Sequence, residues 1–191
     1  MGDLTDADLD SVLIGGREHR PIVVVGYDER WPSRYEGLAQ QVVASLKGQE
    51  VSVHHIGSTA VPGLAAKPII DLLLVVQDVE AERDYVQHLE EAGFVLRVRE
   101  PGHRMFRTPK RDVHLHVLSA GAPEITDYLD FRDWLRTDEG DRVLYSSAKQ
   151  HLALQDWSDM NYYAEAKSGT VLQILERARR WRKSSKDRAR Q

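Results

Sequence analysis

Residues 69–76 restrict the fold of this chain most strongly, because they are apolar at every position except Asp71. An apolar run of this length is typical of a β-strand that is buried on both faces of a sheet. A carboxylate inside such a strand costs free energy unless it is paired, hydrogen-bonded or bound to a metal. The run therefore predicts a central strand and makes Asp71 a candidate functional residue, with a structural hydrogen bond as the alternative.

The rest of the chain alternates strand and helix patterns before it becomes helical. Further strands are predicted at 22–25, 51–56, 94–99, 103–108 and 113–118, and helices at 31–46, at 85–92 and from residue 123 onward. These patterns indicate one α/β (α+β) domain over residues 21–183 with a helical C-terminal half. Residues 1–20 are predicted to form a loosely ordered leader with a short helix at 6–13, and residues 184–191 a basic flexible tail.

Composition excludes several classes of protein. The 191 residues include no cysteine, so disulfides, thiolate metal sites and a thiol nucleophile are absent. The net charge is −4, but residues 176–191 carry eight Lys or Arg and two acids, which leaves −10 for residues 1–175. This acidic body argues against nucleic acid as a partner, although the basic end can still contact RNA or an acidic partner. No apolar run is long enough to cross a membrane, and the acidic N-terminus is unlike a signal peptide, so we expect a cytoplasmic protein.

The segment between the predicted strands at 51–56 and 69–76 has the features of an anion-binding loop. Gly57 lets backbone N–H groups approach a ligand closely, and the Ser58 hydroxyl adds a donor. Lys67 follows, where an ammonium group can neutralise phosphate charge. A Gly-Ser pair alone is commonly an ordinary turn, but its separation from Asp71 across one strand–loop–strand unit favours a functional site.

This spacing resembles the nucleotidyltransferase superfamily, and the string HIGSTAVPGLAAKPIIDLLLVV at 55–76 resembles the GrpB family within it. The resemblance continues in VVGYDERWPSRYE at 24–36, HLHV at 114–117, FRDWLR at 131–136 and YYAEAKSGTVLQIL at 162–175. It implies a nucleotidyltransferase-like mixed β-sheet flanked by helices. It also implies that Gly57, Ser58 and Thr59 hold the phosphates of a nucleoside triphosphate, and that Asp71 binds a divalent metal.

One departure from the superfamily pattern affects the metal site. Catalytic members place two acids two residues apart on one strand face, whereas this chain has Leu73 at the second position. His114 and His116 are the nearest replacement, because alternation along a strand puts both imidazoles on one face. We therefore expect Asp71, His114 and His116 to hold Mg²⁺ or Mn²⁺, with Zn²⁺ or Fe²⁺ as alternatives. The histidines could instead transfer protons, or one could be a structural group.

Cations for an anionic ligand come from several segments. The set expected to bind phosphate comprises Lys67, Arg104, Arg132, Lys149 and Lys167, although a residue of this kind taken alone is more often a surface ion-pair partner. His55 and Tyr163 are expected to line the site. Tyr163, with Trp157 and Tyr162, is also a candidate to stack on a base, although aromatic residues on helices are commonly core residues.

These residues lead to two hypotheses. In the first, the protein is an enzyme that uses a nucleoside triphosphate to modify or activate a small-molecule acceptor, with Asp71, His116 and Lys67 as catalytic residues. The acceptor is left open among amino acids, sugars, aminoglycoside-like antibiotics, metabolites of the coenzyme A pathway and RNA. In the second, the missing acid at Leu73 leaves a non-catalytic module that binds a nucleotide or a phosphorylated metabolite. The oligomeric state is not indicated.

Overall fold

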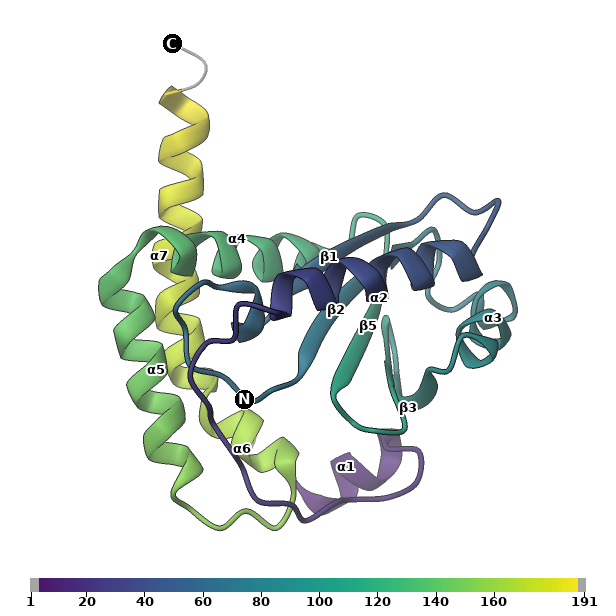
Figure 1. Cartoon of the computed structure of the whole chain (residues 1–191), viewed down its shortest axis with the longest axis horizontal. Helices are drawn as coiled ribbons and strands as arrows, with labels where there is room; N and C mark the ends of the chain where they lie inside the picture. Colours follow the sequence, from purple (N-terminus) through teal and green to yellow (C-terminus); the bar gives the residue numbers. More distant parts are fainter. Residues whose placement is uncertain (1–3, 189–191) are drawn as a thin grey trace.

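A five-stranded sheet forms the centre of the computed structural model, which describes residues 4–188 (Figure 1). Its strands are β1 Ser52–Ile56, β2 Ile70–Val76, β3 Val95–Glu100, β4 His103–Arg107 and β5 Val113–Ser119. They lie in the order β1-β2-β5-β4-β3. β2 and β5 run parallel, and the other neighbouring strands run antiparallel. The predicted mixed sheet is confirmed, and the apolar run has a neighbouring strand on each side.

Helices cover both faces of the sheet and make up the C-terminal part of the described chain. Their bounds are α1 Asp6–Val12, α2 Trp31–Ser45, α3 Val86–Glu91, α4 Pro123–Thr137, α5 Glu139–Ala153, α6 Met160–Ala166 and α7 Ser168–Arg188, with short 3₁₀ turns η1 Ser58–Ala60 and η2 Glu82–Asp84. The helical C-terminal half is therefore confirmed. No helix within residues 4–188 is long and apolar enough to cross a membrane.

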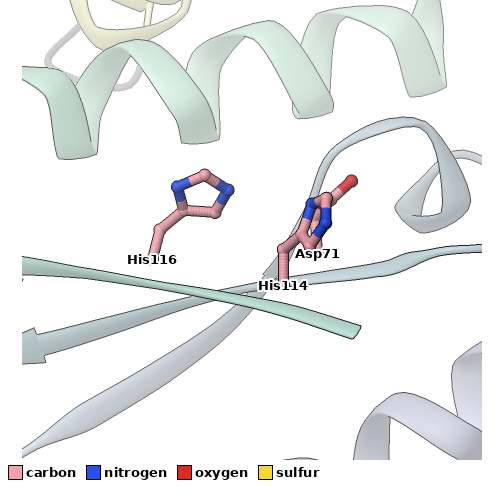
Figure 2. A group of neighbouring side chains, drawn as sticks. All are labelled: Asp71, His114 and His116. Atoms are coloured by element: carbon pink, nitrogen blue, oxygen red, sulfur yellow. The ribbon is translucent and has the colours of Figure 1, made fainter. Parts of the chain in front are cut away.

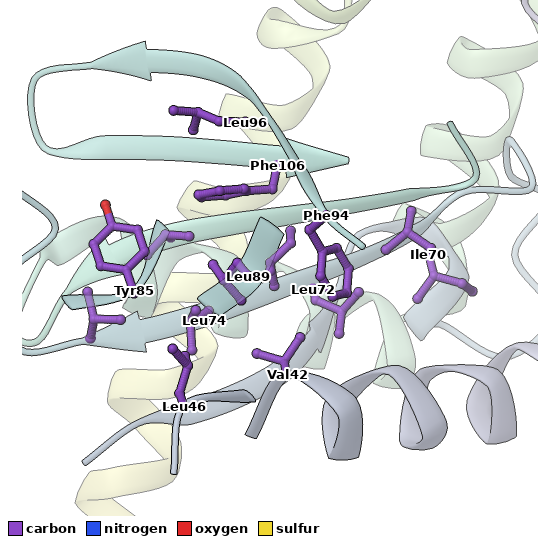
Figure 3. Packing of buried hydrophobic residues seen from close by; sticks show 14 of the residues in the cluster. Val42, Leu46, Ile70, Leu72, Leu74, Tyr85, Leu89, Phe94, Leu96 and Phe106 are labelled. Carbon is purple, nitrogen blue, oxygen red and sulfur yellow. The ribbon is translucent and has the colours of Figure 1, made fainter. Parts of the chain in front are cut away.

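One face of the sheet packs against α2 and α3 (Figure 3). Alternate residues of β2, among them Leu72 and Leu74, are fully buried in this cluster together with Leu89, Phe94 and Phe106. Burial of each such side chain stabilises the fold by about 1.5–3 kcal/mol. A shift of β2 by one residue would place Asp71 in this apolar layer, so the packing fixes the register.

The other face of β2 presents Asp71, Leu73 and Val75 toward α4. Leu73 is fully buried in a small cluster with Ile56 and Leu118. The C-terminal helices form a separate cluster with the loop after β1, comprising Val61, Leu64, Leu135, Tyr145 and Ile174. The candidate functional residues therefore lie between the sheet and the C-terminal helices.

Much of the basic segment after residue 176 pairs with acids of the same chain. The ion pairs join Arg177 to Asp141, Arg179 to Asp127, and Arg182 to both Asp130 and Asp133. α7 continues to Arg188. Residues 189–191 of the predicted tail and residues 1–3 of the predicted leader lie outside the described residues.

The strand predicted at 22–25 is wrong. Val25 makes one isolated bridge, through reciprocal backbone hydrogen bonds of 2.8 and 2.9 Å with Ala66. The side chain of Val23 is more than half exposed. A run of β-branched residues raises strand propensity, but it forms a strand only where another strand is aligned to pair with it. In the preceding leader, the predicted short helix is present as α1, and Glu18 pairs with Arg107 of β4 at 2.8 Å.

Candidate active site

Gly57 places the turn after β1 directly against the carboxylate of Asp71. Its φ of +70° is a conformation that favours glycine, and a Cβ at this position would overlap Asp71 Oδ2. Residues 57–60, which we call the Ser58 turn, consist of Gly57 and the 3₁₀ turn η1. Gly57, Ser58, Thr59 and Asp71 line one cavity of about 300 Å³, which we call the site cavity.

Two arginines of helix α4 donate hydrogen bonds to backbone carbonyl groups in and next to the Ser58 turn. Arg132 donates to the carbonyl of His55 at 3.0 Å, and Arg136 donates to the carbonyl of Ala60 at 2.8 Å. Arg132 also pairs with its neighbour Asp133. The guanidinium of Arg132 therefore fixes the backbone beside the turn and is not part of the cavity wall. This placement corrects the expected phosphate-binding role of Arg132.

His55 supports the Ser58 turn from the α2 side of the sheet. Its ring stacks on Tyr35 with centroids 4.5 Å apart, and its Nε2 lies 3.1 Å from Thr59 Oγ1. Burial lowers the pKa of His55 to about 4, so the imidazole is neutral near pH 7. The expectation that His55 lines the site is corrected, because it positions Thr59 and is itself outside the cavity wall.

Asp71 on β2 and the two histidines on β5 project from the same side of the sheet (Figure 2). The parallel register pairs Asp71 with His114 and Leu73 with His116. His114 Nδ1 lies 3.3 Å from Asp71 Oδ1, and one donor atom from each of Asp71, His114 and His116 lies within 4.8 Å of the others. Two imidazoles and one carboxylate at this spacing fit a divalent metal ion. We call these three residues the metal-ligand set.

Burial and neighbouring charges set the protonation of the metal-ligand set. Burial opposes ionisation of Asp71, but its hydrogen bond to His114 and nearby positive charges outweigh burial and hold the pKa of Asp71 below its ordinary value. Burial, with a smaller effect of His103, lowers the pKa of His116 to about 3. An ionised carboxylate and a neutral imidazole are the forms that coordinate metals. The pKa of His116 therefore favours ligation over proton exchange near pH 7.

Three lysines, named the lysine cluster, line the same cavity from the loop before β2 and from the C-terminal helices: Lys67, Lys149 on α5, and Lys167 between α6 and α7. Lys149 Nζ donates to Ser58 Oγ at 2.9 Å and also to the carbonyl of Ala65. The sequence predicts all three lysines and Ser58 at one site, and the fold brings them together.

The lysine cluster contains more ammonium groups than the described cavity wall has carboxylates. Burial, with the charges of neighbouring lysines, lowers the pKa of Lys149 to about 7 and that of Lys167 to about 8. Burial also lowers the pKa of Lys67. Asp71 is the one carboxylate among the described residues that line the site cavity. A bound polyanion would supply the missing negative charge and restore the protonated state of the lysines.

Tyr163 lines the site cavity, as expected, and two ammonium groups lie over its ring. The ammonium groups of Lys67 and Lys167 lie 5.2 and 4.6 Å from its ring centroid. Its hydroxyl is buried and has no hydrogen-bond partner among residues 4–188. Tyr162 bonds to Asp6 and Trp157 bonds to a backbone carbonyl, and neither belongs to the cavity wall.

Arg104 lies on the opposite face of the sheet and is buried there. Its guanidinium binds the carboxylates of Glu80 and Glu82, each at 2.5 Å. The expected phosphate-binding role of Arg104 is therefore corrected, because alternation along β4 turns Met105 and His103 toward the site face instead. His103 was not among the residues expected at the site, because the sequence does not show which face of β4 is turned toward the site.

A second cavity, of about 490 Å³, adjoins the site cavity. The two share Gly57, Tyr128, Tyr145 and Ala164 in their walls. The remaining wall of the second cavity is mostly apolar and comes from α4 and α7, through Phe131, Val171, Leu172, Leu175, Ser168, Glu124 and Asp127. The site thus offers one compartment with lysines and metal-ligand candidates and one apolar compartment beside it.

The sheet, its helices and the Gly57-Ser58 turn beside Asp71 define a protein of the nucleotidyltransferase fold. The fold resembles that of the Cid1 poly(U) polymerase with MgGTP bound, with a TM-score of 0.51 over 68% of this chain and 44% of the polymerase. The two sequences are 13% identical, so this likeness concerns the fold alone.

The chain belongs to the GrpB family, since the family described as GrpB protein matches residues 21–177. The UPF0157 protein SCO7215 of Streptomyces coelicolor is 51% identical over 166 residues, which are 87% of this chain and 89% of that protein. The crystal structure of conserved protein GrpB from Enterococcus faecalis is 31% identical and has a TM-score of 0.73, covering 82% of this chain and 96% of that chain. The resemblance inferred from the sequence is confirmed.

Proposed function

We propose that this protein is a metal-dependent transferase that uses a nucleoside triphosphate to modify or activate a small-molecule acceptor. The observation that carries the proposal is that the metal-ligand set and the buried lysine cluster line one cavity. Triphosphate chemistry needs both, because the phosphate charge must be neutralised where the transferred group is attacked. The nucleotidyltransferase fold supports the proposal, since the Cid1 polymerase structure holds MgGTP.

The residues of the site cavity then have separate roles. Ser58 and Thr59 donate to phosphate oxygens, and Lys149 and Lys167 neutralise the terminal phosphates. Lys67 neutralises the charge that develops on the leaving pyrophosphate. The catalytic residues we assign are Asp71, His116 and Lys67.

A divalent metal held by Asp71, His114 and His116 would act as a Lewis acid on phosphate oxygens. Two imidazoles beside one carboxylate favour Mn²⁺ over Mg²⁺, because Mg²⁺ prefers all-oxygen coordination and imidazole suits transition metals. We therefore expect activity with Mn²⁺ to exceed activity with Mg²⁺. The adjoining apolar cavity is assigned to the acceptor or to the nucleoside.

The direct test measures pyrophosphate release and new mass adducts. The purified protein is mixed with each of the four ribonucleoside triphosphates, Mn²⁺ or Mg²⁺, and a pool of amino acids, sugars, aminoglycosides and coenzyme A precursors. Turnover that depends on the metal and is lost in Asp71→Asn supports the transferase. The matched control is Asp156→Asn, because that acid is 93% exposed and lies outside the site cavity.

A non-catalytic nucleotide-binding module is the second candidate, and Leu73 is the observation that favours it. Catalytic nucleotidyltransferases have a second acid at this position, whereas Leu73 here is fully buried in an apolar cluster. A module would bind a nucleoside triphosphate or inorganic tripolyphosphate without releasing pyrophosphate under any metal or acceptor condition. It would also keep its affinity for tripolyphosphate in Asp71→Asn, since the lysine cluster is unchanged.

A further inference from the structure

A series of two hydrogen bonds connects His116 to two residues outside the metal-ligand set. His116 Nδ1 lies 3.0 Å from Nε2 of His103, the first residue of β4. His103 Nδ1 in turn lies 2.6 Å from Oε1 of Glu100, the last residue of β3. The two imidazole rings are close to parallel, at 14°. We call these two residues the Glu100–His103 pair.

The sheet holds the Glu100–His103 pair in place through its backbone pairing. Glu100 faces His103 across the β3–β4 turn, and β4 pairs with β5 so that Met105 faces His116. The turn is constrained by Gly102, whose N–H donates to Glu80 at 2.8 Å. The ring of His103 is about four-fifths buried, so little water competes for its hydrogen bonds.

The carboxylate of Glu100 is the acceptor at the end of this series of hydrogen bonds. It determines which ring nitrogens of the two histidines carry a proton. An ionised carboxylate can only accept, so Glu100 requires a proton on His103 Nδ1. In neutral His103 the other nitrogen, Nε2, is then an acceptor, and it requires a proton on His116 Nδ1. In neutral His116 this leaves the lone pair on Nε2. Figure 2 shows one nitrogen of the His116 ring turned toward Asp71 and His114 and the other turned away.

We propose that Glu100 and His103 are positioning residues of the metal site, which hold His116 as the Nδ1–H tautomer with its Nε2 lone pair directed toward Asp71 and His114. This inference rests on the proposed metal-binding function. Metal-bound histidines generally donate their second ring N–H to an outer acceptor, and loss of that acceptor typically lowers metal affinity about 10–100-fold. Here the outer acceptor is a second histidine that is oriented by Glu100.

The first test needs no metal. Nitrogen-15 chemical shifts of the histidine rings report the tautomer, and the His116 signals are assigned by their loss in His116→Asn. We expect the Nδ1–H tautomer in the wild type and a mixed or Nε2–H tautomer in His103→Leu. Nε2–H in the wild type would overturn the proposal, because it would mean that His103 donates to His116 and that the nitrogen facing Asp71 is already protonated.

The second test is Mn²⁺ binding measured by calorimetry. We expect His103→Leu and Glu100→Gln to weaken Mn²⁺ binding about 10–100-fold and about several-fold, respectively. His103→Gln should regain part of the affinity, since its amide oxygen can accept from His116 Nδ1–H. His88→Gln and Glu90→Gln are controls, because both residues belong to α3 and are exposed.

The outcomes separate this inference from the proposed function. If the wild type binds Mn²⁺ and His103→Leu binds it equally well, the positioning role is wrong and the metal site stands. If the wild type binds no Mn²⁺, the proposed metal site is wrong, and so is the positioning role of the Glu100–His103 pair at that site. Circular dichroism and melting of each variant show whether a loss of affinity comes from unfolding.

Discussion

The backbone of Gly57 lies against the carboxylate of Asp71 so closely that a side chain at position 57 would overlap it. The contact joins the Ser58 turn to the metal-ligand set. A change at either residue therefore displaces the other, so the proposed phosphate-binding turn and the proposed metal ligands are mechanically coupled at this point.

Gly57→Ala should impair both the proposed phosphate binding and the proposed metal binding. The positive φ costs roughly 1–2 kcal/mol for a residue with a Cβ, and the overlap with Asp71 adds to this cost. Gly63→Ala is the matched control, because Gly63 has φ of +76° but no atom near its missing Cβ. We expect both variants to melt earlier than the wild type, and only Gly57→Ala to lose Mn²⁺ and tripolyphosphate binding in calorimetry. Equal binding losses would show that backbone strain alone matters.

Lys149→Met should stabilise the protein at low pH while it weakens anion binding. The pKa of Lys149 is lowered to about 7 in the fold, below its ordinary value of 10.5. The unfolded chain thus holds more protons between these values, and the wild type gains stability as pH rises through that range. Below about pH 7 the penalty is fully present, so the variant should be the more stable protein there.

Denaturant unfolding of the wild type and Lys149→Met at about pH 6 and about pH 10 tests the sign of this dependence. The advantage of the variant should shrink toward the higher pH. Calorimetry with inorganic tripolyphosphate at about pH 8 should show proton uptake on binding in the wild type, because the anion restores the protonated lysine. Lys47→Met, exposed in the turn after α2, is the control. A pH-independent stability difference would contradict the assigned charge state.

Arg104→Met should leave ligand binding intact and lower stability. The guanidinium is buried against Glu80 and Glu82 on the sheet face away from the site cavity. Loss of hydrogen bonds to charged groups typically costs about 1.5–3 kcal/mol. Equilibrium denaturation measures the loss, and tripolyphosphate titration measures binding. An intact fold with reduced tripolyphosphate affinity would reinstate Arg104 as a phosphate ligand.

Asp130→Ala should destabilise the packing of α4 on α7 more than Asp127→Ala does. Asp130 is buried and accepts from Arg182 at 2.6 Å, whereas Asp127 pairs with Arg179 at the surface. We expect a loss of about 1–3 kcal/mol for the first variant and below about 1 kcal/mol for the second. Denaturant unfolding of the two variants gives the comparison, and equal losses would mean that burial of the pair is unimportant.

The sequence-based predictions were most accurate where a residue pattern is compatible with only one local structure. The apolar run around Asp71 needs a central strand, and the alternation of His114 and His116 needs one face of a neighbouring strand. The segments that resemble the GrpB family then predicted that the sheet is mixed. The strand predicted at 22–25 failed because β-branched composition carries no information about whether a partner strand is aligned with it.

The candidate site was predictable residue by residue only for side chains whose direction followed from the pattern. Arg104 and Arg107 are out of phase on β4, and the sequence does not say which face is the site face. His55 is next to the Ser58 turn in sequence but projects to the α2 side. Arg132 contacts a backbone carbonyl that no sequence pattern marks. The Glu100–His103 pair depends on tertiary pairing of three strands.

The walls of the site cavity come from two parts of the chain. The metal-ligand set lies on the sheet, whereas Lys149 lies on α5 and Lys167 lies between α6 and α7. An anion bound to both would act as a noncovalent cross-link between these parts, so its concentration would control how often the helices open away from the sheet. Sensitivity to proteases within α5 and α6 would then measure the occupancy of the site, and the proposed ligand would contribute to the stability of the fold.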